Sequence, residues 1–533
     1  MTAPFLHLLM KHSILSIIAA ALTSVAASGA VVSGVVKDSS GAPLAGVPVS
    51  DGFRVVQTDA SGHYRIETDK AAGLVFVSTP SGYAPSAANV NLPLFWRLVT
   101  SPSDEDETAD FVLDKVDDSR FAFIAFADNQ ISNRSGEVAC FNSTTVPDIN
   151  ATLDSLRAGG YAPFMIALGD QAHDCYWKSN RYGLQEAYSD LRKLNAPLYS
   201  VMGNHDNDNT AMNDFDAAAE WRRNLGPNYY SFNKGGVHFV VLDNIEIVDG
   251  SPQLSDDGEC VYKNRLTPGQ LEWLRQDLAL VADKNLPLVV AMHAPLYYFP
   301  GGAKTYYLEN AQELIDALDG FRDVRVLSGH THVSYASQSA DGRIYENNYG
   351  AVCGSWWLNA RVDLGNDNNI CRDGTPSGYA VWKWTDGEFS DYYKSTGLPA
   401  DVQFRAYDMN MVELDGAEVA PEYAAGREKT NEVMVNVWGY GPGWSVEMFE
   451  NGKALSVERQ RARDPLFLLS CPIPYMAAGN KLIGTVRPVY TMHLFTAKAS
   501  AADTPVEIRI TDRCGNVYSS VVKRPQPMSL SMH

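Results

Sequence analysis

The stretch FAFIAFADNQ, residues 121–130, is a continuous apolar run that ends on an acid. A run of this length, bounded by polar residues, predicts a buried strand. Asp128 then stands at the carboxyl end of that strand, which is a common position for a metal ligand. Gln130 follows two residues later, so the strand end carries an amide beside a carboxylate.

The same arrangement recurs four times further along the chain. The other polar strand ends are Gly169–Asp170, Gly203–Asp206, His293 and Gly329–His332. Residues at the same edge of successive parallel strands converge in the crevice where open α/β sheets bind ligands. A lone histidine is more often a core residue, but five aligned strand ends favour a metal site. Aspartate, histidine and asparagine together suit Mn, Fe or Zn better than Mg or Ca.

Short strands alternate with helical stretches throughout this middle region, residues 118–398. The clearest helix lies in LTPGQLEWLRQDLALVAD, residues 266–283. Thr267 is its expected N-cap, Pro268 opens the first turn, and Leu271, Leu274 and Leu278 share one face. The alternation predicts an α/β layered fold.

The two flanking regions have the sequence pattern of all-β domains. Residues 31–117 alternate apolar and polar positions between Asp-Gly and Ser-Gly turns, which predicts a small Ig-like β-sandwich. Residues 399–533 are strand-rich again and predict a second, C-terminal β-sandwich.

Residues 1–30 have the layout of a secretory signal peptide. Lys11 precedes an apolar run, residues 13–30, that ends in small residues. A membrane anchor needs about 20 apolar residues, and this run is shorter, so we expect no membrane span. We expect cleavage near residues 27–30 and export of the mature protein to the periplasm or the extracellular space.

The amino-acid composition excludes some classes of binding partner and metal site. The chain is 45% hydrophobic and 20% charged, as in soluble globular proteins, and its net charge of −20 repels polyanions, so we expect no nucleic-acid binding. None of the seven cysteines forms a CxxC pair, which excludes a zinc ribbon. In an exported protein, Cys140 with Cys175 and Cys353 with Cys371 are candidate disulfides.

The series of strand ends, D-x-x, GD, GNHD, H and GHTH, resembles the calcineurin-like metallophosphoesterase family. CGSWW (residues 353–357), DGTPSGY (residues 373–379) and the flanking sandwiches further resemble a bacterial three-part branch of that family. Its N-terminal sandwich is related to carboxypeptidase regulatory-like domains. The resemblance implies a β-sandwich core flanked by helices, with two divalent metal ions (Mn, Fe or Zn) at one edge.

The family's ligands transfer residue by residue. The first metal would take Asp128, Asp170 and His332, and the second would take Asp170, Asn204, His293 and His330, so that Asp170 bridges both. Two such ions can activate a bridging water and stabilise the phosphoryl oxygens.

His205 and Asp206 are the candidate catalytic pair. His205 would donate to a phosphate oxygen or protonate the leaving group. Asp206 would orient His205, or would instead cap the following loop.

Gln130 departs from the family pattern, which has a histidine at this position. A neutral amide is a weaker donor for borderline metals, so the first site should bind its ion more loosely or take a replacement ligand. His173 is the candidate replacement, because it stands three residues after Asp170, where purple acid phosphatases place a tyrosine ligand. The alternatives are Gln130 itself or water.

These features predict a secreted metal-dependent hydrolase of phosphoester bonds, either mono- or diesters. Its substrate would be a phosphorylated small molecule, glycan or lipid. The alternative is a surface glycan-binding or scaffold protein whose metal centre has weakened, which only Gln130 favours. Trp356 and Trp357 either stack on the substrate or pack between domains. The polar residues Asn347, Asn348 and Arg372 lie in the same region, and the sequence does not discriminate among them.

Overall fold

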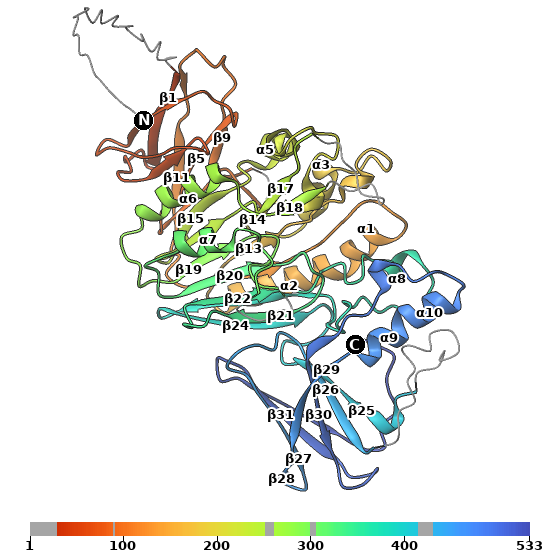
Figure 1. Ribbon diagram of the computed structural model, residues 1–533. Coiled ribbons are helices and arrows are strands. Elements are labelled where there is room, and N and C mark those ends of the chain that lie inside the picture. Colours follow the sequence, from red (N-terminus) through yellow and green to blue (C-terminus); the bar gives the residue numbers. More distant parts are fainter. Residues whose placement is uncertain (1–28, 89–90, 251–260, 299–304, 414–429) are drawn as a thin grey trace, which may run out of the picture.

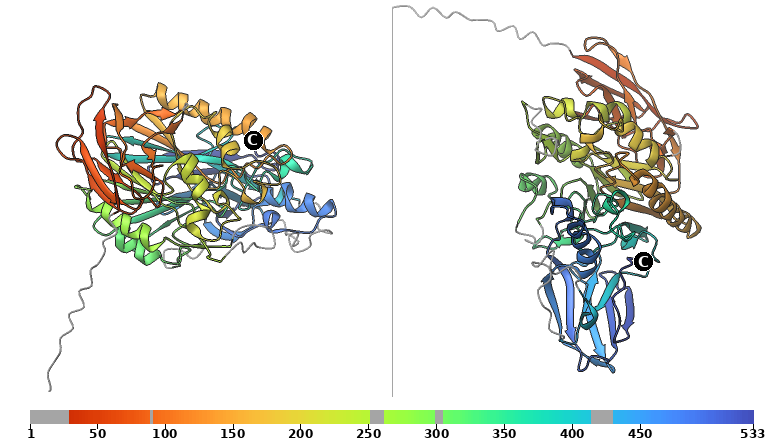
Figure 2. Two further views of the ribbon diagram at one scale, coloured as in Figure 1. Left: turned by 90° about the horizontal axis from the view of Figure 1, so that it is seen from above. Right: turned by 90° about the vertical axis from the view of Figure 1, so that its right-hand side faces the viewer.

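The computed structural model of the chain describes residues 29–533 except 89–90, 251–260, 299–304 and 414–429. Nearly all of the predicted signal peptide, and Cys260, therefore lie outside the described residues. Three parts follow one another in space as in the sequence, with the middle part between the two others (Figures 1 and 2). Within the described ranges, no helix is both long and apolar enough to cross a membrane.

The N-terminal part consists mainly of two facing sheets. One sheet is built around β1 (Ala30–Asp38), with β4 (His63–Thr68), β10 (Glu107–Thr108), β11 (Phe111–Lys115) and β6 (Tyr83–Pro85). The other has the order β3 (Val55–Gln57), β2 (Pro48–Ser50), β5 (Leu74–Val77) and β9 (Trp96–Leu98). Along β1 every second residue is buried, as expected of a strand with one face on a core.

Two further sheets form the centre of the middle part. The first has the order β14 (Leu198–Val201), β13 (Ala162–Leu168), β12 (Phe121–Phe126), β23 (Gly378–Thr385) and β24 (Glu388–Ser395). The second has the order β15 (Tyr230–Lys234), β16 (Val237–Val241), β19 (Leu288–Ala291), β20 (Val324–Ser328), β22 (Ile344–Asn348) and β21 (Tyr335–Gln338). The neighbours β12, β13 and β14 are parallel, and so are β16, β19, β20 and β22.

The apolar run in β12 has a physical cause, because both faces of the strand are covered. Phe121 and Phe123 belong to the core between the two sheets, whereas Ile124 and Phe126 belong to a second core under the helices. A strand buried on both sides loses the alternation of polar and apolar residues.

Helices cover the outer faces of both middle sheets. Residues of α2 (Val146–Ala158) and α3 (Leu184–Leu191) pack with the first sheet, and those of α6 (Pro268–Ala279) and α7 (Ala311–Ala317) pack with the second. In α6 the Thr267 hydroxyl accepts a hydrogen bond from the Gln270 amide (3.3 Å), and the three predicted leucines are buried. The predicted α/β fold, a sandwich core flanked by helices, is confirmed.

The C-terminal part is a two-sheet sandwich with short helices beside it. One sheet has the order β25 (Phe404–Asp408), β26 (Glu432–Val437), β30 (Thr491–Lys498) and β29 (Val457–Ala462). The other has the order β28 (Lys453–Ala454), β27 (Ser445–Glu450), β31 (Val506–Thr511) and β32 (Val517–Val522). Helices α9 (Pro465–Ser470) and α10 (Pro472–Ala477), which the sequence analysis did not predict, follow β29.

Both predicted disulfides are wrong. Cys140, Cys353 and Cys371 are free thiols. The buried thiol of Cys353 contacts Oε1 of Gln130 (3.6 Å), while the buried thiol of Cys371 contacts the carbonyl of Ala351 (3.6 Å). Each of these two thiols faces a different oxygen acceptor.

Candidate metal centre

The polar strand ends meet at one edge of the middle sandwich. Asp128, Asp170 and Asn204 follow β12, β13 and β14 of the first sheet. His293 follows β19, and His330 and His332 follow β20, both in the second sheet. All six side chains therefore come from carboxyl ends of parallel strands, as predicted from the sequence.

Glycines allow the ligand-bearing turns to approach each other. A Cβ on Gly203 would lie 2.2 Å from Oδ1 of Asp170, and a Cβ on Gly169 would lie 2.2 Å from Nδ1 of His293. A side chain at either position would displace a ligand, which gives a physical reason for the glycines that precede Asp170 and Asn204.

Several of the candidate ligands have left-handed backbone conformations. Asp128 (φ 56°), Gln130 (42°), Asp170 (54°), His330 (71°) and His332 (53°) all have positive φ. Non-glycine residues in this region cost conformational energy and cluster at functional sites, where the surrounding structure holds them in place. The strained backbone conformations therefore lie at the same edge of the sheets as the candidate metal ligands.

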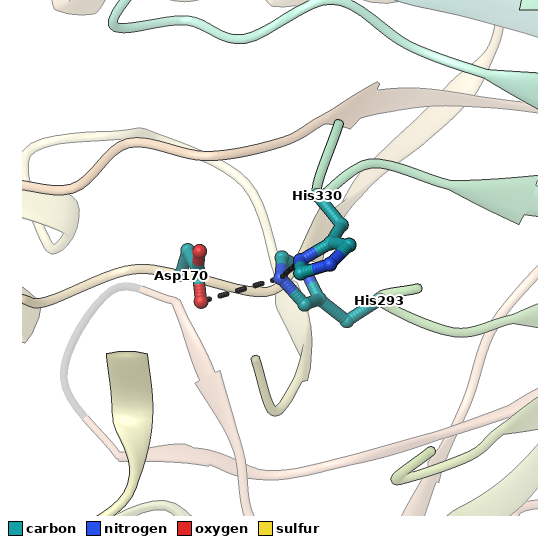
Figure 3. Close-up of side chains that lie close together, drawn as sticks. All are labelled: Asp170, His293 and His330. Atoms are coloured by element: carbon teal, nitrogen blue, oxygen red, sulfur yellow. Dashed lines mark hydrogen bonds and ion pairs between the residues drawn. The ribbon is translucent and has the colours of Figure 1, made fainter. Parts of the chain in front are cut away.

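Four donor atoms converge on one point beside Asp170. Nε2 of His293 lies 3.3 Å from Oδ1 of Asp170 and 3.1 Å from Nδ1 of His330, as Figure 3 shows. Oδ1 of Asn204 lies 3.0 Å from that same His293 nitrogen and 2.9 Å from that same His330 nitrogen. These are the four residues proposed for the second metal.

The first-metal residues Asp128 and His332 lie next to each other at the same edge. Nε2 of His332 is 3.5 Å from Oδ1 of Asp128. Nε2 of Gln130 donates to Oδ2 of Asp170 (3.1 Å), so Gln130 faces the oxygen opposite the one that faces His293. The two oxygens of Asp170 thus have different neighbours, the His293 imidazole on one side and the Gln130 amide group on the other.

The protonation states fit a site made for cations. Burial opposes ionisation of Asp170, but His293 and His205 hold the pKa of that carboxyl well below its usual range. Burial raises the pKa of Asp128 to about 7 and lowers that of His330 well below its usual range. Burial and the charge of Arg372 lower the pKa of His332 to about 3. Neutral imidazoles beside ionisable carboxyls are the donor set that divalent transition metals bind, with release of protons.

Backbone oxygens fix the other nitrogen of two of the histidines. Nδ1 of His293 bonds the Leu168 carbonyl (2.8 Å), and Nδ1 of His332 bonds the Gly354 carbonyl (3.1 Å). Nε2 of His330 bonds the hydroxyl of Tyr307 (3.1 Å). Such outer contacts set the tautomer that turns a lone pair toward a metal.

The predicted pairing of His205 with Asp206 needs correction. Nδ1 of His205 bonds Oδ1 of Asp174 at 2.8 Å. Asp206 instead accepts from the backbone amides of Gly203 (2.9 Å) and Ala172 (3.0 Å), because the tight turn Asn204–Asp206 directs its carboxylate back at the chain. The capping alternative therefore describes Asp206, and Asp174 is the acid that the sequence analysis missed.

His173 lies close to His205 but groups with other residues. The two imidazole centroids are 4.2 Å apart. The donor atoms of His173 cluster with those of Asp174 and Cys175, whereas Asp170 clusters with His293 and His330. Burial lowers the pKa of His173 well below its usual range, so it is a neutral imidazole. Nε2 of Gln130 donates to Oδ2 of Asp170 (3.1 Å).

The two tryptophans have different environments. Trp357 is buried and donates from Nε1 to the Asn129 carbonyl (2.7 Å), which is a packing role. The ring of Trp356 stacks on His332 at 3.8 Å and 14°. Trp356, Tyr307 and Cys353 all contact candidate ligands or Gln130. Trp356 and Cys353 belong to the CGSWW motif, whereas no local pattern in the sequence marks Tyr307.

Comparisons with known families cover nearly the whole length. Residues 123–334 match the model described as calcineurin-like phosphoesterase. Residues 30–116 and 346–518 match the models of the N-terminal and C-terminal parts of calcineurin-like phosphoesterase.

Curated relatives resemble only part of the chain. Serine/threonine-protein phosphatase CPPED1 of Mus musculus is 31% identical over 32% of this chain and 53% of its own length. The same protein of Bos taurus is 28% identical with the same coverage. Purple acid phosphatase 15 of Arabidopsis thaliana is 29% identical over 26% of this chain and 24% of its own length. The chain thus spans about half the length of the first of these relatives.

Solved structures resemble about half of this chain. A dimetal phosphatase from Danio rerio aligns with 52% of this chain and 98% of its own, with a TM-score of 0.33 and 14% identity. A 5'-nucleotidase precursor from Thermus thermophilus aligns with 52% of this chain and 54% of its own, with a TM-score of 0.30 and 14% identity.

Proposed function

Because the chain belongs to the calcineurin-like phosphoesterase family, we propose that it is a metal-dependent hydrolase of phosphoester bonds. The observation that carries this proposal is the convergence of Asp170, Asn204, His293 and His330 on one point. One oxygen of the Asp170 carboxylate faces His293, and the other faces Gln130.

The donor set itself supports metal binding. Nε2 of His293 and Nδ1 of His330 lie 3.1 Å apart, and both are within 3.0 Å of the Asn204 carbonyl oxygen. The two imidazole nitrogens and the amide oxygen each carry a lone pair, and few protons are available to form hydrogen bonds between them. A bound cation would therefore stabilise this group of atoms better than hydrogen bonds do. Asp170, Asn204, His293 and His330 would hold one ion, and Asp128, Asp170 and His332 would hold the other, with the Gln130 amide bonded to Asp170 beside them.

Two divalent ions bound there would stabilise the phosphoryl oxygens and lower the pKa of a water between them. The chain's own residues would orient the substrate and move one proton. His205 is held through Nδ1 by Asp174, so its Nε2 is directed toward the metal edge, 4.0 Å from Oδ2 of Asp170. From that position Nε2 would donate a proton to the leaving oxygen or a hydrogen bond to the phosphoryl group.

We further propose that the protein is exported and acts on a phosphorylated small molecule, glycan or lipid. The apolar segment at residues 13–30 supports export. N-terminal sequencing of the mature protein should find a start close to residues 28–31. A mature chain that begins at residue 1 would overturn the export proposal.

Hydrolysis of nitrophenyl phosphate and bis-nitrophenyl phosphate tests the proposed activity. The purified protein is loaded in turn with Mn, Fe and Zn, and each sample is measured before and after a chelator. We expect turnover that the chelator abolishes and the metal restores. Asp170→Asn is the matched inactive control, because it keeps the size of the side chain but removes the bridging charge. No turnover with every metal would overturn the enzyme proposal and favour a glycan-binding protein.

A further inference from the structure

Arg372 reaches the metal edge from the junction between the middle and C-terminal parts. Its Nη2 donates to the Thr331 carbonyl (3.0 Å), and its Nη1 donates to the Gly484 carbonyl (3.4 Å). The backbone of Arg372 accepts from the Val489 amide (3.4 Å). The middle part and the C-terminal part therefore hold this arginine between them.

The guanidinium of Arg372 lies beside the first-metal residues. Thr331 stands between the candidate ligands His330 and His332 in the sequence. The carbon Cζ of Arg372 is 5.5 Å from the centre of the Trp356 ring, which itself stacks on His332. No other arginine or lysine in the described residues donates to the GHTH turn.

Arg372 forms no ion pair with a carboxylate in the described part of the chain. Among the described residues, no carboxylate lies within 4.0 Å of its guanidinium. The neighbouring Asp373 is already engaged by the Ser334 amide (2.7 Å) and by Nε2 of His493 (3.1 Å). Nε of Arg372 is buried and has no hydrogen-bond partner.

Burying an unpaired cation is costly unless something neutralises it. Two neutral carbonyls orient the guanidinium but leave its charge uncompensated. In a chain of net charge −20, an unpaired arginine at a metal edge is suited to an anionic ligand, because guanidinium binds phosphate oxygens through several parallel donors.

We propose that Arg372 binds the phosphoryl group of the substrate and makes the enzyme selective for phosphate monoesters over diesters. This inference rests on the proposed function. A monoester phosphate carries nearly two negative charges at neutral pH, whereas a diester carries one. A cation beside the site therefore stabilises the bound monoester more strongly than the bound diester.

The test compares Arg372→Met with Arg372→Lys and with a remote control. Methionine keeps most of the side-chain volume without the charge, and lysine keeps the charge without the fork of donors. Arg343→Met is the control, because Arg343 also donates to a carbonyl, that of Leu318 (2.8 Å), but precedes β22 at the opposite end of the sheet. Each variant is loaded with Mn and its metal content is measured.

Two measurements are then made on each loaded variant. The first is kcat/KM for nitrophenyl phosphate and for bis-nitrophenyl phosphate. The second is the affinity for inorganic phosphate by calorimetry, which needs no turnover. For Arg372→Met we expect both the phosphate affinity and the monoester kcat/KM to fall roughly 10- to 100-fold. The diester kcat/KM should change less, and Arg372→Lys should be intermediate.

The outcomes separate this inference from the proposed function. If the unmodified protein turns over neither ester, the proposed function fails and Arg372 has no substrate to select. If it is active but Arg372→Met keeps its phosphate affinity and its ester preference, the inference about Arg372 is wrong. Loss of metal from Arg372→Met would also overturn it, because the arginine would then support the ligands rather than the substrate.

Discussion

At the scale of single residues, the chemistry depends on which atom of each side chain faces the metal edge. Leu168 and Gly354 bind Nδ1 of His293 and His332 through their carbonyls, so these two histidines present Nε2. His330 presents Nδ1 instead, because Tyr307 occupies its Nε2. Burial opposes protonation of His293, but the charge of Asp170 raises its pKa to about 9, so a metal that binds there would displace a proton, whereas His330 and His332 are already neutral.

Asp174 should act on catalysis through His205. We expect Asp174→Asn to lower kcat by roughly 10- to 100-fold with unchanged metal content, because the amide can still accept from Nδ1 but no longer supports its charge. The loss should be larger for alkyl phosphates than for nitrophenyl phosphate, whose leaving group needs no proton. His205→Ala should lower kcat by roughly 10²- to 10⁴-fold.

Asp206→Asn is the matched control for this prediction. This substitution replaces one of the two carboxylate oxygens that accept hydrogen bonds from the backbone amides of Ala172 and Gly203. It leaves the His205–Asp174 bond in place. We expect a lower thermal midpoint and no dependence of its effect on the leaving group. If the loss of kcat depended on the leaving group equally in Asp174→Asn and Asp206→Asn, Asp206 would also orient His205.

Gln130 should weaken the first metal site. We expect Gln130→His to raise the affinity of this site for Zn by roughly tenfold, because imidazole is a better donor than an amide for borderline metals. Metal titration followed by elemental analysis measures this directly. His173→Ala should retain both metals, since the donor atoms of His173 group with those of Asp174 and Cys175. Loss of one metal from His173→Ala would show that His173 is the replacement ligand.

At the scale of elements, helix α6 joins the middle part to the N-terminal sandwich. Trp273 on this helix donates from Nε1 to the Ser50 hydroxyl (3.1 Å), and its ring lies 6.2 Å from that of Phe76. On the same helix, Gln276 bonds both the Val55 amide and the Phe53 carbonyl, each at 3.1 Å. Helix α6 thus packs against a sheet of the N-terminal sandwich on one side and against the second sheet of the middle part on the other.

We expect Trp273→Ala to lower the free energy of unfolding by about 3–5 kcal/mol, because it leaves a large cavity in a close-packed core. Urea unfolding followed by tryptophan fluorescence measures the loss. Trp273→Phe is the control, which keeps most of the buried area and should cost less. A loss below about 1 kcal/mol for the alanine variant would mean that the contact does not stabilise the protein.

At the scale of the whole molecule, the three parts are joined in two different ways. One continuous hydrophobic core includes Val36 and Phe76 of the N-terminal sandwich together with Phe123 of the middle part. The C-terminal sandwich has a core of its own, with Val435 and Ile508. The predicted boundary near residue 117 thus separates two units that share a core. The C-terminal sandwich meets the middle part through a separate apolar cluster, which includes Leu358 and Ile370 of the middle part with Met434 and Leu494, and through polar contacts such as those of Asp373 and Arg372.

A cavity of about 310 Å³ lies where the N-terminal sandwich meets the middle part, and Asp243 and Asp214 line it. Burial, with the charge of Asp214, raises the pKa of Asp243 to about 7. The folded protein therefore keeps a proton that the unfolded chain releases near pH 4, so stability should fall as pH rises from about 4 to about 7.

Asp243→Asn should flatten this part of the stability profile. We expect the change in unfolding free energy between pH 5 and pH 8 to shrink by about 1–3 kcal/mol, since one pKa unit corresponds to about 1.4 kcal/mol. Urea unfolding at the two pH values measures it. Asp214→Asn should have a smaller effect, because burial raises the pKa of Asp214 only to about 6. A profile unchanged by Asp243→Asn would show that this carboxyl is ionised in the folded protein.

The amino-acid sequence by itself determined the α/β core, the helix at residues 268–279 and the edge where the candidate ligands meet. These features depend on local patterns: an apolar run, an N-cap, and a polar residue directly after a strand. Parallel strands then bring such residues together whatever the loops do. The identity of all six residues from the strand ends could therefore be read without a structure.

Only the tertiary structure decided the partners of these residues. Asp174, and not the adjacent Asp206, bonds His205 because a tight turn reverses the direction of Asp206. Arg372 reaches the site because the C-terminal part supplies Gly484 and Val489 to hold it. Cys353 and Cys371 do not form the predicted disulfide, and each thiol contacts a different oxygen. Each of these contacts depends on the direction of a loop or on residues distant in sequence, which no local pattern encodes.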